Sequence, residues 1–175
     1  MIEYRIRPLR PEAHLFEVTL TVAKPTPEGQ AFTLPAWIPG SYMIRDFARH
    51  LVYLEASCQG ETLPVAKIDK QTWQVPPCDG PVQLHYHVYA WDLSVRGAHL
   101  DTTHGYFNGT CVFLAPMGHE DQPCEVDIDA PEGVAYLGWH LATGLPRLTG
   151  SELGFGRFRA DNYDALIDHP VEMGP

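Results

Sequence analysis

Histidine and glutamate are the residues from which a hydrolytic zinc site is built, and this sequence holds both. On a helix such a site needs two histidines four residues apart, so that both imidazoles project from one face, with a glutamate beside the first as general base. The single His-Glu dipeptide is His119-Glu120, and it continues as Asp121-Gln122-Pro123. The second ligand position is therefore a proline, and the sequence contains no helical zinc motif.

A second arrangement of histidines is His85-Tyr86-His87. Residues two apart on a strand point the same way, so both imidazoles could reach one metal ion, with His99 or His104 as a third ligand. A small metalloenzyme would follow from that reading. The alternative is that both histidines decorate the outer face of a strand whose inner face is the apolar row from Val82 to Ala90.

Residues for nucleophilic catalysis do not form a recognisable pattern. None of the serines lies in the G-x-S-x-G turn that lifts a nucleophile above a sheet. The glycine-rich stretch 150–156 lacks the lysine of a phosphate-binding loop. The sequence therefore predicts neither a serine triad nor a nucleotide site.

The four cysteines are spaced without any C-x-x-C pair that could bind zinc or exchange disulfides. They are Cys58, Cys78, Cys111 and Cys124. We expect free thiols, mostly buried, with two disulfides as the alternative for a secreted protein. The N-terminus lacks the apolar region of a secretory signal, so the expected location is the cytoplasm.

The charge of the chain limits its partners. It has 175 residues, with 12 Lys and Arg against 22 Asp and Glu, and a formal net charge of −10. Nucleic acids and anionic membranes require a basic face, so neither is expected as a partner. The length suits one core, and we expect residues 1–175 to form a single β domain.

Glycine and proline decide which elements can form. Sixteen prolines and fifteen glycines are scattered through the chain, which leaves little room for long helices. About nine or ten short strands indicate an all-β, sandwich-like or saddle-like antiparallel domain. The expected strands are Glu3–Arg7, His14–Val22, Ala31–Leu34, Leu51–Cys58, Leu63–Ile68, Thr72–Val75, Val82–Ala90, Thr110–Leu114, Cys124–Asp129 and Gly154–Arg159.

One segment is ambiguous between helix and strand, and one short helix is expected near the C-terminus. Residues Leu51–Cys58 fit a strand, but apolar positions from Ile44 onward also have helical spacing. A short C-terminal helix is expected over Tyr163–Asp168, capped by Asp161 or Asn162.

Two further segments carry more aromatic and paired charged residues than packing requires. Residues 35–47 combine a Pro-Gly turn with large aromatics and an Arg-Asp pair, and residues 89–101 repeat the mixture where a strand enters a loop. Each is either a structural corner or a wall that faces a ligand or partner.

At these segments the sequence resembles the N-terminal domain of the glycyl aminopeptidases, a zinc metallopeptidase family of the gluzincin clan. The matching blocks follow the family's order: Trp37–Tyr42 with Ile44–Phe47, Tyr89–Arg96, Phe107–Thr110, and Tyr163–Asp168 with Pro170–Met173. The resemblance implies that the motif residues are structural or lie at a domain interface. These residues are Trp37, Pro39, Gly40, Tyr42, Arg45, Asp46, Trp91, Asp92 and Arg96.

The resemblance also implies what lies outside this chain. In the family a mostly helical catalytic domain follows, and its zinc is held by H-E-x-x-H and a downstream glutamate, which have no counterpart here. We therefore expect a non-catalytic domain of an aminopeptidase that releases N-terminal glycine or small residues. This chain is expected to carry no metal, cofactor or catalytic residue, and the zinc to be in the missing catalytic domain.

The resemblance suggests the partners of the domain as well. They are the catalytic domain of the same polypeptide and a peptide substrate, and an apolar docking patch would favour self-association of the fragment. By analogy with related aminopeptidases, a polar loop would line the cleft entrance: Tyr106, Phe107, Asn108, Gly109 and Thr110. The alternative function is a stand-alone β-sandwich module that presents Trp37, Tyr42, Trp91 and Tyr106 to a peptide or carbohydrate.

Overall fold

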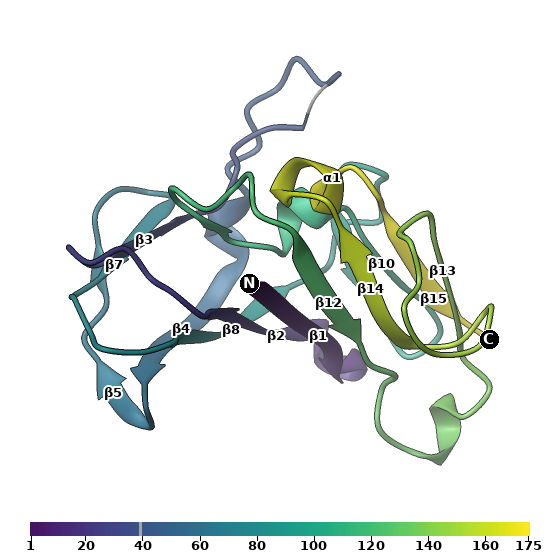
Figure 1. Cartoon of the computed structure of the whole chain (residues 1–175). Coiled ribbons are helices and arrows are strands. Elements are labelled where there is room, and N and C mark those ends of the chain that lie inside the picture. Colours follow the sequence, from purple (N-terminus) through teal and green to yellow (C-terminus); the bar gives the residue numbers. More distant parts are fainter. Residues whose placement is uncertain (39) are drawn as a thin grey trace.

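The computed structural model describes residues 1–38 and 40–175, and most of their regular structure is β. The largest sheet runs through the middle of the molecule (Figure 1), in the order β14-β12-β1-β2-β8-β4-β5. Its strands are β1 (Ile2–Arg10), β2 (Leu15–Val22), β4 (Leu51–Cys58), β5 (Glu61–Leu63), β8 (Val82–Tyr89), β12 (Cys124–Ile128) and β14 (Gly156–Ala160).

Two four-stranded sheets accompany the large one, in the orders β13-β15-β10-β9 and β11-β3-β7-β6. The first contains β9 (Ala98–Leu100), β10 (Gly105–Phe107), β13 (His140–Thr143) and β15 (Val171–Gly174). The second contains β3 (Gln30–Thr33), β6 (Ala66–Lys67), β7 (Thr72–Val75) and β11 (Ala115–Pro116). The all-β prediction is confirmed, although the described residues form more strands than predicted, because many strands are only two to four residues long.

Alternating burial along β2 and β8 sets the two faces of the large sheet. The strands pair antiparallel with Val18 opposite Tyr86, and both side chains are fully buried. Glu17 and His85 lie on the opposite, partly exposed face. The predicted inner and outer faces of these strands are therefore confirmed. One pairing in this sheet is parallel, that of β1 with β12.

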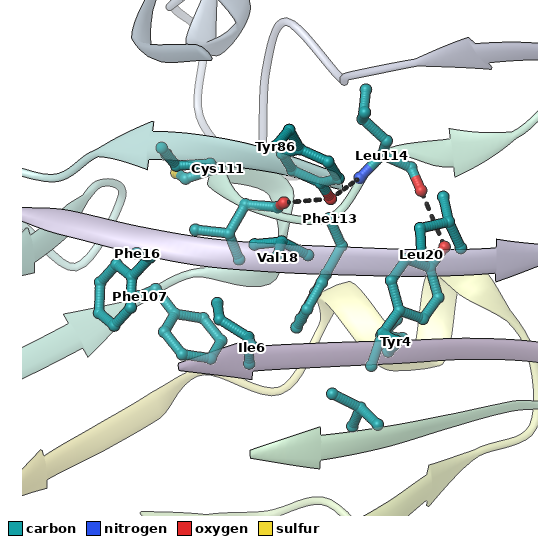
Figure 2. Packing of buried hydrophobic residues seen from close by; sticks show 14 of the residues in the cluster. Tyr4, Ile6, Phe16, Val18, Leu20, Tyr86, Phe107, Cys111, Phe113 and Leu114 are labelled. Atoms are coloured by element: carbon teal, nitrogen blue, oxygen red, sulfur yellow. Dashed lines mark hydrogen bonds between the residues drawn. The ribbon is translucent and has the colours of Figure 1, made fainter. Parts of the chain in front are cut away.

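Buried tyrosines bind the segment that follows the loop at residues 108–110 (Figure 2). The Tyr86 hydroxyl donates a hydrogen bond to the Val112 carbonyl at 2.8 Å and accepts one from the Leu114 N–H at 3.1 Å. The Tyr4 hydroxyl donates to the Leu114 carbonyl at 2.8 Å. Because a buried backbone group without a partner is costly, these hydroxyls replace the neighbours that a sheet would supply.

This bonding explains why the strand predicted over Thr110–Leu114 is wrong. Residues Gly109–Cys111 form a short 3₁₀ helix, η3. Beyond it, the Phe113 carbonyl accepts a hydrogen bond from the Tyr163 hydroxyl at 2.6 Å. The segment is apolar because it is buried. It does not join a strand until Ala115.

Helical structure is sparse. The predicted C-terminal helix is confirmed as α1 (Tyr163–Ile167), where the Asn162 side chain accepts from the Ala165 N–H at 2.8 Å. The other 3₁₀ helices are η1 (Pro11–Ala13), η2 (Phe47–His50) and η4 (Val134–Tyr136). Within the described ranges, no helix is long and apolar enough to cross a membrane.

Three sequence predictions have definite outcomes in the remaining elements. The ambiguous stretch Leu51–Cys58 is a strand, β4. The strand predicted over Leu63–Ile68 splits, because β5 ends at Leu63 in the large sheet while β6 belongs to the β3–β7 sheet. All four cysteines are free and three of them are buried, as predicted.

Candidate functional site

The first of the two unusual segments projects from the body of the molecule between β3 and η2 (Figure 1). Its base is closed by the Ala36 carbonyl, which accepts from the Arg45 N–H at 2.7 Å and the Asp46 N–H at 3.3 Å. Asp46 has a left-handed backbone (φ 47°) and turns the chain into η2, where Phe47 is buried. Its carboxylate also pairs with Lys70 at 2.7 Å. The segment is thus anchored at its base.

The second segment connects β8 to β9 and folds back on itself. The Asp92 N–H donates to the Ala98 carbonyl at 3.0 Å, and Trp91 pairs with His99 in an isolated bridge. Gly97 lies against the Asp92 side chain, and a Cβ at this position would come within 2.7 Å of Asp92 Oδ2. Glycine is therefore required for the loop to close around the carboxylate.

A cavity of about 190 Å³ lies between the two segments. We call it the aromatic cleft. It brings together Arg45, Trp91 and Asp92, which the sequence assigned to separate motif blocks. Other lining residues include Ile44, Phe47 and Cys111.

Trp91 is held in the wall of the aromatic cleft by stacking. Its ring lies 3.9 Å from the His14 ring and 4.9 Å from the His99 ring, centroid to centroid. Even so, 55% of the Trp91 residue surface is exposed. A large aromatic group that is fixed in position but open to solvent is suited to contact another molecule.

Exposed apolar side chains gather on both segments. They are Trp37, Tyr42, Met43 and Ile44 on the first and Trp91, Leu93 and Val95 on the second, and we call them the apolar rim. Tyr42 is completely exposed. Isolated exposed apolar residues are ordinary, but three of these seven, Met43, Ile44 and Trp91, line one cavity, which is typical of a protein–protein or ligand contact surface.

The titratable groups of the aromatic cleft include a buried thiol and a partly buried histidine. Burial raises the pKa of the Cys111 thiol to about 12, so this sulfur stays protonated and is a poor nucleophile. Burial, together with the neighbouring Arg49 charge, lowers the pKa of His50. The sequence indicated Cys111 only as a buried thiol and gave no signal for His50.

The loop predicted to line a cleft entrance is largely internal. Phe107, Gly109 and Thr110 are buried, and Asn108 Oδ1 accepts hydrogen bonds from both the N–H (3.1 Å) and the hydroxyl of Thr110. The Tyr106 hydroxyl donates to the Val95 carbonyl at 2.9 Å. The N–H and the hydroxyl of Thr110 are therefore bonded within the loop. Contact between the loop and a substrate stays a prediction.

The other motif residues that the structure describes lie outside the lining of the aromatic cleft. Gly40 is exposed on the first segment, beside the exposed Trp37 and Tyr42. Arg96 is exposed, and its carbonyl accepts from the Cys111 thiol at 3.6 Å. Pro39 lies outside the described residues. The structure thus gathers three of the predicted motif residues, Arg45, Trp91 and Asp92, in the lining of the aromatic cleft.

A family model for the Peptidase M61 N-terminal domain matches residues 3–175. The chain belongs to this family. The resemblance found in the sequence motifs is therefore confirmed at the level of the family. No curated protein matches the chain.

Two solved structures resemble the M61 domain. It matches an aminopeptidase N family protein from Idiomarina loihiensis with 49% identity and a TM-score of 0.96, covering 99% of this chain and 29% of that one. An M1 zinc metallopeptidase from Deinococcus radiodurans matches at 16% identity with a TM-score of 0.53, covering 99% and 41%. The second likeness shows a shared fold. The M61 domain spans less than half of either protein.

The sequence contains no H-E-x-x-H motif, but one group of side chains that could ligate a metal occurs in the described ranges. It comprises Glu17, His85 and His87. The third ligand predicted for the histidine pair, His99 or His104, is wrong. His99 belongs to β9 and stacks on Trp91 instead. The strand spacing indicated the histidine pair, whereas Glu17 comes from the neighbouring strand.

Proposed function

We propose that this chain is the non-catalytic N-terminal domain of a zinc metallo-aminopeptidase and that it packs on the catalytic domain through the apolar rim. The main support for this proposal is the family match from residue 3 to residue 175 in a chain that spans only 29% of its Idiomarina relative. A domain of a larger peptidase needs a surface for the rest of the protein, and the apolar rim is suited to that task.

The composition of the apolar rim supports this role. Tyr42, Met43 and Ile44 are each at least 60% exposed on a segment that is closed at its base by backbone hydrogen bonds. Association buries such side chains and gains free energy in proportion to the apolar area removed from water. Arg45 and Asp92 in the adjoining cleft add charges that can fix the orientation of the partner.

The chemistry of peptide hydrolysis would then belong to the catalytic domain. This chain lacks H-E-x-x-H, and the Cys111 thiol is held protonated. The domain would contribute by shaping the wall of the cleft that receives a peptide. Release of N-terminal glycine or another small residue follows from the resemblance to glycyl aminopeptidases.

The first test compares this chain with the polypeptide extended through the proposed catalytic domain. Glycyl p-nitroanilide hydrolysis should be absent in residues 1–175 with added zinc and present in the longer protein. Zinc-dependent turnover by residues 1–175 alone would refute the proposal. Inactivity of a longer, folded and zinc-loaded protein toward glycyl and other small N-terminal residues would remove the proposed specificity.

The second test concerns the docking surface. Ile44→Ser should weaken association of the separately produced domains about 10-fold, which corresponds to about 1.4 kcal/mol. Leu137→Ser is the matched control, since Leu137 directly follows η4, is 84% exposed and lies outside the apolar rim. Equal effects of the two changes in calorimetric titration would exclude the apolar rim as the docking surface.

A stand-alone binding module is the second proposal, and the exposure of Trp37, Tyr42 and Trp91 favours it. Tyr106 does not, because its hydroxyl is bonded to Val95 within the domain. Calorimetric titration of residues 1–175 with oligosaccharides and extended peptides separates the two proposals. Saturable binding that is lost in Trp91→Ala would support the module.

A further inference from the structure

Strand pairing brings three metal-ligating side chains to one point on the outer face of the large sheet. In the register of β2 and β8, which lie side by side (Figure 1), Glu17 is directly opposite His87 and Thr19 is opposite His85. Side chains alternate between faces along each strand, so Glu17, His85 and His87 share the face opposite the buried core. All three are only partly exposed.

The distances among their ligand atoms suit a small cation. Glu17 Oε1 lies 2.9 Å from His85 Nε2 and 3.9 Å from His87 Nε2, and ligand atoms of the three residues lie within 4.8 Å of one another. Zinc bonds of about 2.0–2.2 Å place tetrahedral ligand atoms roughly 3.3 Å apart. The two Glu17 distances differ from that separation by about 0.6 Å or less, which small side-chain rotations supply.

Neighbouring side chains hold the three ligands in position. Glu55 Oε1 lies 3.3 Å from His85 Nδ1, which leaves His85 Nε2 directed at Glu17. The Tyr53 ring packs at 5.0 Å from the His87 ring. A carboxylate that bonds the second nitrogen of a ligating histidine fixes its tautomer and orientation, which is the usual surrounding of a protein metal site.

Arg7 is the cation that competes for the same place, and its geometry leaves room for a metal. The Arg7 Nε–H donates to Glu17 Oε2, so Oε1 stays available. Arg7 also pairs with Glu132 at 2.6 Å. Glu17, Glu55 and Glu132 outnumber the Arg7 guanidinium, and the nearby Arg5 is paired with Asp129, so the surroundings are acidic and favour a divalent cation.

A hydrogen-bond network without an ion explains only part of this arrangement. Glu17 Oε1 can accept from His85 at 2.9 Å, but His87 Nε2 is too far from the same oxygen for a hydrogen bond. A cation between the three atoms accounts for both imidazoles facing one oxygen.

The geometry points to a zinc-binding site formed by Glu17 Oε1, His85 Nε2 and His87 Nε2, with a water molecule as the fourth ligand. Two imidazoles and one carboxylate suit Zn²⁺ better than the oxygen-seeking Mg²⁺ or Ca²⁺. The ion would connect β2 to β8 on the solvent side of the sheet. This inference is independent of the proposed peptidase role.

Calorimetric titration of untagged, chelator-treated residues 1–175 with ZnCl₂ tests the site. We expect one zinc per chain, with MgCl₂ giving no binding. His87→Gln should weaken zinc binding at least about 100-fold, and Glu55→Gln, which removes an orienting contact, about 10-fold. His140→Gln is the matched control, because His140 is an exposed histidine on β13.

Co²⁺ provides a second readout. Tetrahedral Co²⁺ absorbs visible light more strongly than six-coordinate Co²⁺, so Co²⁺ bound in the four-coordinate geometry proposed for zinc should colour the protein. Circular dichroism of each variant verifies folding, which His87→Gln should preserve because it alters the outer face only. Stoichiometric binding that His87→Gln leaves unchanged, or the absence of saturable zinc binding by the unaltered chain, would overturn the assignment.

Discussion

Removal of the Tyr86 hydroxyl should destabilise the domain more than removal of any other tyrosine hydroxyl. Tyr86→Phe keeps the ring but leaves the Val112 carbonyl and the Leu114 N–H without their partner, and both residues are fully buried. Each unsatisfied buried group costs about 1–3 kcal/mol. Because the carbonyl and the N–H relax together, we expect the free energy of unfolding to fall by about 2–4 kcal/mol.

The comparison variants follow from the same contacts. Tyr4→Phe removes one bond, to the Leu114 carbonyl, so its cost should be about half as large. Tyr42→Phe is the control, because Tyr42 is completely exposed and removal of its hydroxyl should change the free energy of unfolding by no more than about 0.5 kcal/mol.

Urea unfolding followed by tryptophan fluorescence measures these differences, and the Tyr86→Phe midpoint of thermal unfolding should fall by about 4–16 °C. The slope of the urea transition should stay constant if only the native state is affected. Equal stability of Tyr86→Phe and Tyr42→Phe would show that the segment at 112–114 finds other partners and would refute the reasoning.

Two further predictions concern alkaline pH and the aromatic cleft. Burial raises the pKa of Tyr4, Tyr86 and Tyr163, whereas in the unfolded chain these phenols ionise near pH 10. Their contribution to the free energy of unfolding is therefore complete below about pH 10 and is lost as the pH rises further. A spectrophotometric titration at 295 nm should therefore show these tyrosines ionising together with unfolding, and their ionisation in the folded protein near pH 10 would contradict the prediction. Gly97→Ala should lower the free energy of unfolding by about 1–3 kcal/mol, because its Cβ would lie 2.7 Å from Asp92 Oδ2, while Gly138→Ala, which meets nothing within 4 Å, should be neutral in the same urea assay.

The sequence predicted the faces of the long strands because their alternation is local. Eight residues of β8 alternate between apolar and polar, which is enough to identify the buried row from Val82 to Val88. The short helix α1 could likewise be predicted from the sequence, because Asn162 caps its N-terminus. Among the short strands, β3 and β7 were predicted from their apolar and β-branched residues, whereas β10 and β15 were not, because so few residues show little alternation.

The candidate site depends on contacts that no local pattern encodes. The residues 35–47 and 89–101 were each unusual, but only the fold brings Arg45 beside Trp91. The segment at 112–114 was mistaken for a strand because its hydrogen-bond partners include hydroxyls as distant in sequence as Tyr4. The position of Glu17 beside His87 likewise follows from strand register.

The parallel pairing of β1 with β12 has a consequence for synthesis on the ribosome. Residues 2–10 can pair with β2 early, but the other edge of β1 has no partner until residues 124–128 have emerged from the exit tunnel. During translation that edge offers unpaired amides and carbonyls to any neighbouring nascent chain. Slow codons or pauses between these two stretches would prolong the exposure and favour co-translational aggregation, whereas the finished domain covers the edge with β12.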